Sequence, residues 1–270
     1  MFCAACDLAF FARRYNEEEM SSLYGSYRDK PYVAVRRRWE PWYSDKVNDA
    51  YMGDANKAVR ERQQFMVDNL SACGKWAPYS CVVDVGGDEG QFIPDTIDAA
   101  QRLVFDVSAK PLRTGVERIG DHEELRTARP GLVIMAHVLE HLSDPLRQLR
   151  EIYDASPIGS VFYAEVPLDR PQLSRYHRTD LYRLWLQATS RAKGVFMALD
   201  FLTGACRQLF GKVPALGIVK QSEHVSYFSP DSLGAILRSA GYDVLHYTMD
   251  RNAKTGSYRL GRLGMVAVKT

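Results

Sequence analysis

The order of apolar and helical segments along the chain constrains its fold more than any other feature of the sequence. From residue 81 onward, short apolar runs alternate with segments of helical periodicity. The predicted strands are residues 81–85, 103–105, 116–119, 132–136 and 160–166, followed by a final pair at 242–247 and 263–268. Such alternation is typical of an α/β fold, in which helices cover both faces of a mostly parallel sheet.

Several helices are recognised by their first residues. Asp144-Pro145 and Ser229-Pro230 each combine a capping side chain with a proline in the first helical turn. Another helix is expected over residues 92–100, again with a proline in its first turn. The last two strands are separated by a loop that contains asparagine and glycine, which favours an antiparallel hairpin.

The chain divides into an appendage of residues 1–74 and a main domain of residues 75–270. The appendage is dense in Tyr, Trp and Arg, and it ends in a helix expected from Met52 onward and closed by Gly74. Residues 168–222 interrupt the alternation with helical, aromatic-rich sequence, and we expect them to form a helical lid over a bound ligand. In the appendage, residues 36–39 (RRRW) could bind an anionic or sugar-bearing ligand or could form a solvated face.

Composition indicates a soluble globular protein with a sizeable core. Hydrophobic residues make up 46% and charged residues 25% of 270 residues, and the net charge is +2. So small a charge gives no electrostatic reason to expect nucleic acid or an anionic membrane as partner. Charged residues and a proline interrupt the apolar stretch 194–219, so no membrane span is expected. Five scattered cysteines do not make a disulfide framework, which favours a cytoplasmic setting.

A loop rich in glycine and acidic residues follows the first strand of the main domain. Its sequence is DVGGDEG, residues 84–90, and glycine there lets the backbone approach a ligand at a helix N-terminus. Asp84, Asp88 and Glu89 would repel a pyrophosphate but would favour an ammonium and a sulfonium, the charges of S-adenosylmethionine. Asp106 ends the next strand 22 residues after Asp84, at the position of an acid that binds ribose hydroxyls.

These segments together resemble the class I S-adenosylmethionine-dependent methyltransferases, in the branch that modifies sugars and other small molecules. The matching segments are VVDVGGDEGQF, VFDVS, RIGDHEEL, VIMAHVLEHLSDP, YAEVP and HVSYFSPDSLGAILRSAGYDV, in that order along the chain. They cover roughly residues 78–170 and 222–270. The resemblance implies a Rossmann-like sheet of seven strands whose last strand is antiparallel.

The resemblance also implies a set of residues that bind the cofactor. Gly86 and Gly90 would lie under its amino acid part, Asp106 on the ribose, and Asp121 and His122 near the adenine. The full set of expected cofactor residues is Asp84, Gly86, Gly87, Gly90, Asp106, Asp121, His122 and His137. The chain departs from the family pattern at Asp88, where a glycine is common, and at Gly131, where an acid is common.

The segment HVLEH, residues 137–141, also matches the H-x-x-E-H signature of a zinc hydrolase. That chemistry needs both histidines on one helical face, whereas this segment directly follows a strand, so we consider a zinc hydrolase less probable. Ubiquinone-pathway O-methyltransferases resemble this loop and hold a divalent ion there, which His137, Glu140 and His141 could also do. A helix cap or a packed imidazole is the commoner role of such residues, and we assign no metal.

Cys3 and Cys6 form a C-x-x-C pair close to the start of the sequence. Related sugar methyltransferases carry two such pairs around zinc in an N-terminal module, and structural zinc needs four ligands. One pair fits a remnant of that module, whose other part is either absent from this chain or lost.

We expect O-methylation of a small molecule, most simply at a hydroxyl of a sugar or secondary metabolite. A hydroxyl must lose its proton, and His224 is the first candidate for the base, with His141 and Glu140 as second candidates. His224 could instead pack at a strand edge. C- or N-methylation, and a non-catalytic subunit that only binds S-adenosylmethionine, remain alternatives.

Overall fold

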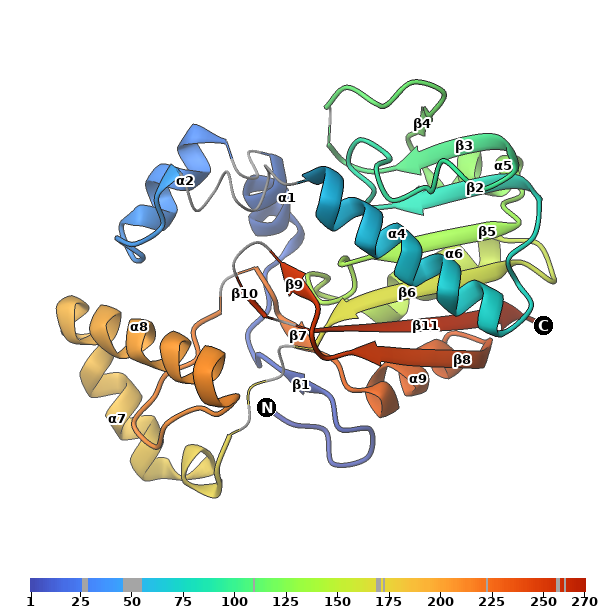
Figure 1. Cartoon of the computed structure of the whole chain (residues 1–270). Coiled ribbons are helices and arrows are strands. Elements are labelled where there is room, and N and C mark those ends of the chain that lie inside the picture. Colours follow the sequence, from blue (N-terminus) through green and yellow to red (C-terminus); the bar gives the residue numbers. More distant parts are fainter. Residues whose placement is uncertain are drawn as a thin grey trace.

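A computed structural model of the chain describes residues 1–25, 29–45, 55–108, 110–168, 171, 173–221, 223–255, 258–259 and 261–270. Its centre is a sheet of seven strands in the order β4-β3-β2-β5-β6-β11-β8 (Figure 1). The strands are β2 (Tyr79–Val85), β3 (Ala99–Phe105), β4 (Glu117–Ile119), β5 (Leu132–Ala136), β6 (Val161–Pro167), β8 (Tyr242–Asp250) and β11 (Arg262–Lys269). Strands β4, β3, β2, β5 and β6 pair in parallel, and β11 pairs antiparallel with β6 and β8. The predicted seven-stranded sheet with an antiparallel last strand is therefore confirmed.

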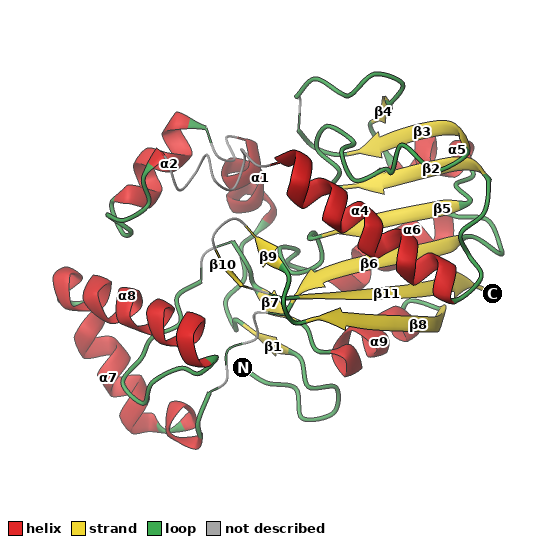
Figure 2. Cartoon of the chain, viewed as in Figure 1, coloured by secondary structure: helices red, strands yellow, loops and turns green. Residues whose placement is uncertain are grey.

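Two apolar clusters, one on each face of the sheet, make up the core. Helix α4 (Ala55–Ala72) covers one face with Met66 and Leu70, which pack on Val82 of β2. The other face is covered by α5 (His122–Ala128), α6 (Pro145–Ala155) and α9 (Pro230–Ser239), which lie behind the sheet in Figure 2. The central strands β5 and β6 are buried along their whole length, as expected for parallel strands covered on both sides.

The predicted helix starts are confirmed by their caps. The Asp144 side chain accepts a hydrogen bond from Arg147 N at 3.0 Å, and Ser229 Oγ accepts one from Ser232 N at 3.2 Å. Gly74 follows α4 with a left-handed φ of 67°, a conformation that glycine adopts without strain. The expected start of this helix at Met52 lies outside the described residues.

The helix predicted over residues 92–100 does not form, and this prediction was wrong. Residues 91–98 are turns, and β3 already begins at Ala99. Thirteen residues separate β2 from β3, and the glycine-rich loop uses the first five of them. Ile93 and Ile97 are fully buried under α4, which already occupies the face that a crossover helix would cover. The apolar residues of this segment therefore belong to turns that fill the core.

The remaining elements lie beside the carboxyl ends of the parallel strands (Figure 1). In the appendage they are β1 (Ala9–Phe10), α1 (Glu17–Gly25) and α2 (Lys30–Arg37), and in the insert η1 (Arg175–Arg178), α7 (Asp180–Ser190) and α8 (Lys193–Phe210). Two small ribbons complete the fold: β1 with β7 (Ser226–Tyr227), and β9 (Lys254–Thr255) with β10 (Tyr258–Arg259). Among the described residues, no helix is both long and apolar enough to cross a bilayer.

Candidate functional site

The glycine loop, residues 86–90, leads away from the carboxyl end of β2. Gly86 and Gly90 have left-handed φ values of 70° and 80°, which favour glycine. A Cβ at Gly86 would lie 2.4 Å from the side chain of Val138, so the loop after β5 packs directly against this backbone. Asp88, at the position where the family commonly has glycine, also has a left-handed φ, of 54°. No helix follows the loop, so the expectation that a helix N-terminus would face the ligand was wrong.

Asp84 is a completely buried acid at the carboxyl end of β2. Neither of its carboxyl oxygens has a hydrogen-bond partner among the described residues. Burial raises the pKa of this carboxyl to about 8, although Arg62 acts in the opposite direction. A Cβ at Gly87 would lie 2.4 Å from the Asp84 carboxyl carbon, so only glycine fits above this side chain. A buried acid without a hydrogen-bond partner, next to backbone that carries no side chain, is suited to a cationic ligand group.

Asp106 lies at the end of β3, beside the glycine loop. One carboxylate oxygen accepts a hydrogen bond from Asp88 N at 2.9 Å, and the other accepts one from Ser108 N at 2.6 Å. The Asp88 side chain in turn accepts from Ser108 Oγ and forms an ion pair with Lys110 at 2.8 Å. Asp88 and Asp106 are therefore close together, on adjoining loops.

Asp121 caps helix α5, and His122 is the first residue of that helix. Both follow β4, at the same edge of the sheet as Asp106. The Asp121 side chain caps the helix by accepting hydrogen bonds from the backbone N of residues 123 and 124, at 2.9 and 2.8 Å. The His122 ring lies edge-on to Phe105 with 5.0 Å between centroids, and its Nε2 is 3.4 Å from Glu151. Both side chains have structural partners, and their contact with an adenine stays a prediction.

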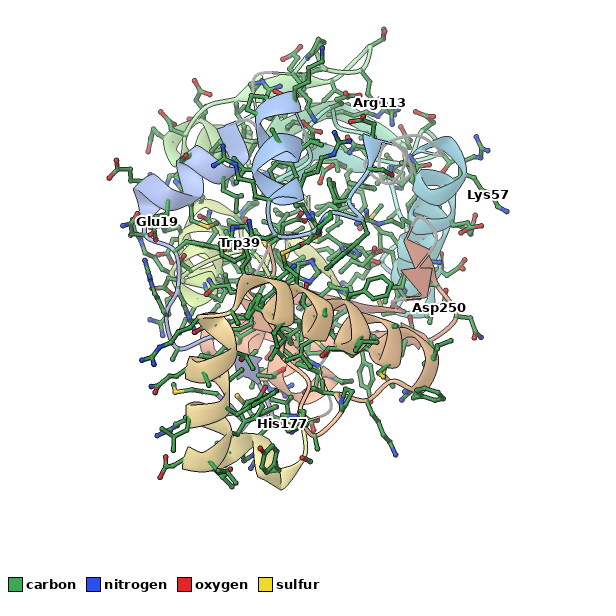
Figure 3. All side chains as sticks on the ribbon, turned by 90° about the vertical axis from the view of Figure 1, so that its left-hand side faces the viewer. Glu19, Trp39, Lys57, Arg113, His177 and Asp250 are labelled. Atoms are coloured by element: carbon green, nitrogen blue, oxygen red, sulfur yellow. The ribbon has the colours of Figure 1, made fainter. Side chains whose placement is uncertain are left out.

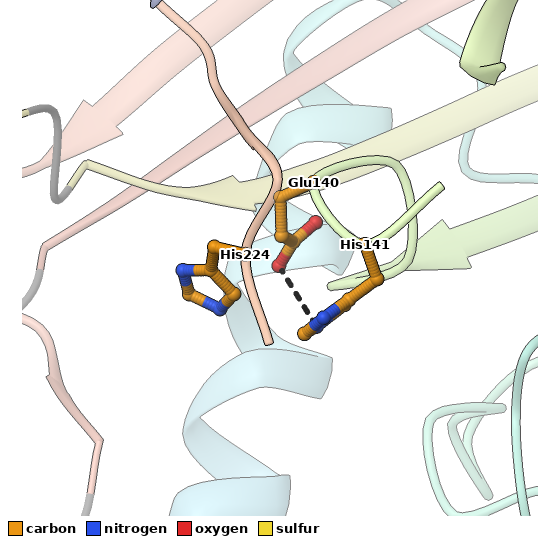
Figure 4. Close-up of side chains that lie close together, drawn as sticks. All are labelled: Glu140, His141 and His224. Atoms are coloured by element: carbon orange, nitrogen blue, oxygen red, sulfur yellow. Dashed lines mark ion pairs between the residues drawn. The ribbon is translucent and has the colours of Figure 1, made fainter. Parts of the chain in front are cut away.

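A cluster of histidines and acids forms where the loop after β5 meets the segment before β7. The backbone N of Val225 and of Ser226 donate hydrogen bonds to Glu140 O at 2.8 and 3.1 Å, which joins the two segments. The rings of His141 and His224 are then 4.8 Å apart, and one ligand atom of each and of Glu140 lie within 4.8 Å of one another (Figure 4). The three residues proposed for catalysis are thus brought together, and no other group of metal-ligating side chains of this kind occurs among the described residues.

His137 joins this cluster to a second buried acid, Glu165 on β6. Its Nδ1 lies 3.3 Å from Glu140 and its Nε2 lies 3.2 Å from Glu165. Arg62 of α4 also contacts Glu165, at 2.7 Å. We call His137, Glu140, His141, Glu165 and His224 the histidine cluster.

The neighbouring side chains favour the ionised form of both acids of the cluster. Burial alone would raise the pKa of Glu140, but the hydrogen bond from His137 and the proximity of the His141 and His224 rings lower it to about 2. Burial opposes ionisation of Glu165 as well, and Arg62 and His137 lower its pKa to about 2. Two ionised carboxylates, each 1% exposed, therefore depend on their contacts with Arg62 and His137.

His141 has the geometry of a neutral proton acceptor. Its Nδ1 is 3.1 Å from the carbonyl oxygen of Glu223, and because a carbonyl only accepts, the proton lies on Nδ1. Nε2 then carries the lone pair, 3.8 Å from Glu140 Oε1. Burial lowers the pKa of His141, with Glu140 acting in the opposite direction, so the ring is neutral at rest. If Nε2 takes a proton, the adjacent carboxylate stabilises the imidazolium.

The appendage contributes residues that sequence reasoning missed. Arg36 of α2, considered with its neighbours as an acceptor-binding or solvated stretch, forms ion pairs with Glu223 and, at 2.8 Å, with Glu40. Tyr32 donates a hydrogen bond to the same Glu223, which directly precedes His224. Arg36 is thus a structural contact between the appendage and the histidine cluster. In the sequence, Glu165 stands out as a single acid within an apolar strand. No sequence pattern connects Arg62 with Glu165, or Arg36 with Glu223.

The structure shows the local form of the two motifs that the sequence associates with metal binding, HVLEH and the C-x-x-C pair. Residues 137–141 form a turn, so His137 and His141 do not share a helical face; His137 contacts the two acids and His141 lies beside His224. Cys3 and Cys6 are close enough for their thiols to form a hydrogen bond, which lowers the pKa of Cys3. A zinc module at this pair stays untested.

A cavity of about 580 Å³ forms an open depression at the opposite edge of the sheet. It is lined by residues at the amino ends of β2, β5 and β6, among them Ser80, Gly131 and Ser160. Ligands of open α/β sheets bind outside the carboxyl ends of the strands, so this depression is not the candidate site.

Comparison with known proteins identifies the domain. A family model described as a methyltransferase domain matches residues 58–247, more than two thirds of the chain. No curated protein matches the sequence. The matched span contains the glycine loop, Asp106 and the whole histidine cluster.

Similar solved structures include three bacterial proteins. A 1,6-didemethyltoxoflavin-N1-methyltransferase from Burkholderia thailandensis has 14% identity and a TM-score of 0.48, with 100% of this chain and 98% of that chain covered. Magnesium protoporphyrin IX methyltransferase from Synechocystis has 13% identity and a TM-score of 0.49, with 94% and 100% covered. An S-adenosylmethionine-dependent methyltransferase from Clostridium acetobutylicum has 9% identity and a TM-score of 0.47, with 84% and 99% covered. At these values we draw nothing about acceptor or mechanism from the three.

Proposed function

This chain belongs to the methyltransferase domain family and is an S-adenosylmethionine-dependent methyltransferase, and we propose that its acceptor is a hydroxyl group of a small molecule, a sugar or a secondary metabolite. The observation that carries the proposal is the placement of His141, with its lone pair on Nε2, between the buried carboxylate of Glu140 and the ring of His224. An aliphatic hydroxyl needs a base to remove its proton, and this cluster offers one.

The residues around the glycine loop fit the cofactor. Asp84 supplies a buried carboxyl without a hydrogen-bond partner among the described residues, and Gly86 and Gly87 let the loop backbone pack directly on Val138 and on Asp84. We assign Asp84, Gly86, Gly87 and Gly90 to its amino acid part and Asp106 to its ribose. Asp121, His122 and His137 complete the proposed binding set, with the adenine beside the first two. When bound, the cofactor supplies a methyl carbon made electrophilic by a positively charged sulfur.

The chain itself contributes alignment and proton removal. Holding two reactants in line can account for about 7–11 kcal/mol of a barrier. Proton transfer to a positioned base adds roughly 10²- to 10⁴-fold in rate. We assign proton acceptance to His141, with Glu140 stabilising its charged form and His224 beside the acceptor hydroxyl. Glu223 and the backbone bonds between residues 140 and 225 hold the two rings in place.

A first experiment tests the cofactor site separately from the chemistry. Calorimetric titration with S-adenosylhomocysteine compares the parent, Asp106→Ala and the control Asp98→Ala, an exposed acid of the loop before β3. We expect Asp106→Ala to weaken binding at least about tenfold, which is roughly 1.4 kcal/mol, and Asp98→Ala to leave it unchanged. Equal affinities for the parent and Asp106→Ala would remove Asp106 from the site.

A second experiment tests the acceptor. The metal-stripped protein and S-adenosylmethionine with an isotope-labelled methyl group are incubated with matched pairs of alcohols and amines, including sugars, and products are identified by mass spectrometry. O-methylated products that fall at least about 10²-fold in His141→Gln, but not in the control His246→Gln on β8, support the proposal. Only N- or C-methylated products would contradict it, and cofactor binding without any turnover would indicate a non-catalytic subunit. Turnover that returns only with added divalent ions would assign Glu140, His141 and His224 to a metal.

A further inference from the structure

The helical hairpin, which we define as residues 174–217 with η1, α7 and α8, differs in charge from the rest of the chain. It contains seven Lys and Arg but two Asp and no Glu, a net charge of +5. Because the whole chain carries +2, the remaining residues together carry −3. The near-neutral total therefore conceals a basic hairpin on a weakly acidic body.

The hairpin also exposes an unusual share of apolar side chains. Of sixteen large hydrophobic side chains exposed in the described part of the chain, eight lie between residues 181 and 216. Single exposed apolar residues are ordinary on a protein surface, but a concentration of them indicates a contact surface. The eight are Leu181, Leu184, Val195, Phe201, Leu202, Leu209, Phe210 and Leu216.

Helix α8 differs from an ordinary surface helix because its outer face is apolar. Val195, Ala198, Leu202 and Leu209 follow the spacing i, i+3, i+7 and i+14, so they share one face, and all four are exposed. Leu209 is 75% exposed, whereas Thr203 of the same helix is 2% exposed and donates its hydroxyl to Leu199 O. The helix thus presents an apolar face to the outside.

The other side of α8 already has its partners within the protein. Phe196 packs edge-on against Trp39, with 6.2 Å between ring centroids, and Phe201, although 51% exposed, has its ring centroid 5.1 Å from that of Trp42. Asp200 forms an ion pair with Lys220 at 2.5 Å. In Figure 3 the hairpin faces the viewer, with the labelled Trp39 beside α8. The exposed stripe is therefore an outer face of a helix that is fixed to the appendage on its inner face.

We propose that the outer face of the hairpin docks the enzyme on an anionic lipid surface. The apolar face would enter the headgroup region, and the basic residues would contact lipid phosphates, the two features of an interfacial amphipathic helix. Arg191 and Lys212 are exposed at opposite ends of α8. The helix would lie in the plane of the surface, which agrees with the absence of a spanning helix among the described residues.

Charge argues against a second copy of the chain as the occupant. Both acids of the hairpin are already in ion pairs, Asp180 with Arg183 at 3.1 Å and Asp200 with Lys220. Two hairpins that met through α8 would bring basic residues together in either orientation: Arg191 onto Lys212 if antiparallel, and each onto its own copy if parallel. The occupant must bring negative charge as well as apolar surface, and an anionic bilayer does both.

Vesicle sedimentation tests the proposal on the full chain. Phosphatidylcholine vesicles with and without phosphatidylglycerol are compared, at low and high salt. We expect binding to the anionic vesicles that weakens with salt, and a fall in binding of at least about tenfold in the double variant Leu202→Asp/Leu209→Asp.

The charge-reversal variant Arg191→Glu/Lys212→Glu should also lower binding about tenfold or more, because each basic residue near an anionic surface contributes about 1 kcal/mol. The matched control is Ile158→Asp, an 81% exposed apolar residue at the far edge of the sheet.

Two further measurements make the result decisive. Circular dichroism and S-adenosylhomocysteine titration show whether each variant is folded, and their outcome does not depend on lipid. Equal binding of the parent to both kinds of vesicle, or equal loss in Ile158→Asp and the double variant, would contradict the proposal. A parent that ignores vesicles but is dimeric by light scattering, and becomes monomeric in the double variant, would assign the face to a second copy.

Discussion

The glycine loop and the histidine cluster lie side by side at the same edge of the sheet but are built in opposite ways. The glycine loop is one short stretch of backbone, and its shape depends on residues that are consecutive in the sequence. The histidine cluster is made of side chains from the loop after β5, strand β6 and the segment before β7, and it is balanced by Arg62 of α4. A site made of local backbone can be recognised from a motif, whereas a site made of distant charges requires the fold.

The largest expected effect concerns the charge balance of the cluster. Arg62→Leu removes the cation that contacts Glu165 and leaves a buried carboxylate uncompensated, so the free energy of unfolding should fall by about 3–5 kcal/mol. Urea denaturation measures this, with Lys57→Leu as control because Lys57 lies on the same helix but is exposed. A loss of less than about 0.5 kcal/mol in Arg62→Leu would show that the cluster does not depend on it.

The second effect concerns the pH dependence caused by Asp84. Its pKa is about 8 in the folded protein and near 3.8 when unfolded, so the folded state holds a proton that the unfolded state releases. The stabilisation is complete below pH 3.8 and is lost as the pH rises to 8, by up to about 4 kcal/mol between pH 4 and 7. Asp84→Asn should remove this fall when unfolding of the cofactor-free protein is followed by urea across that range.

The two acids of the histidine cluster provide an internal control for the pH dependence predicted for Asp84. Glu140 and Glu165 have pKa values near 2, so their stabilisation is present above pH 4.5 and is lost as the pH falls toward 2. Asp84→Asn should keep that acid loss unchanged. An Asn variant with the same decline toward pH 8 as the parent would show that Asp84 is ionised in the folded protein.

The third effect tests the backbone character of the glycine loop. Gly87→Ala places a Cβ 2.4 Å from the Asp84 carboxyl carbon, and the resulting shift should weaken S-adenosylhomocysteine binding by about 1–3 kcal/mol. Gly194→Ala is the matched control, since no heavy atom lies within 4 Å of an added Cβ there. If both variants bind S-adenosylhomocysteine like the parent, the loop tolerates a side chain at residue 87. The glycine loop would then not depend on its bare backbone.

The smallest effect separates two roles of Asp121. Asn caps a helix about as well as Asp, so Asp121→Asn should preserve stability, whereas Asp121→Ala should cost about 1 kcal/mol in thermal unfolding. If Asp121 also contacts the adenine through its carboxylate, Asp121→Asn weakens S-adenosylhomocysteine binding although the helix stays capped. Unchanged affinity in both variants would leave Asp121 with the capping role alone.

The sequence predicted those parts of the molecule whose structure depends on neighbours along the chain. Buried strands, the caps at Asp144 and Ser229, and the antiparallel final strand follow from local patterns. The segment 92–100 was misassigned because its helical periodicity reflects burial of Ile93 and Ile97 in turns, and only the position of α4 over that face shows this. Local apolar spacing does not distinguish a short helix from a packed loop.

Within the site, the candidate residues were found but their relations were not. His141, Glu140 and His224 were singled out because their residue types suit proton transfer, yet they meet only because Glu140 O accepts hydrogen bonds from residues 225 and 226. Arg36 illustrates the limit: three consecutive arginines look alike in the sequence, and one of them contacts Glu223 from more than 180 residues away. Ion pairs across such separations leave no pattern in a single sequence.

The ribbon of β1 with β7 has a consequence for how the enzyme comes to be assembled. Ala9 pairs with Tyr227, so the strand that adjoins His224 is paired with a segment more than two hundred residues earlier in the chain. During synthesis, β1 therefore has to wait until more than two hundred further residues have been added before its partner exists. Closing so long a loop is entropically slow. The proposed acceptor site would therefore be among the last parts of the protein to form, and a nascent or truncated chain would bind cofactor before it could carry out the reaction.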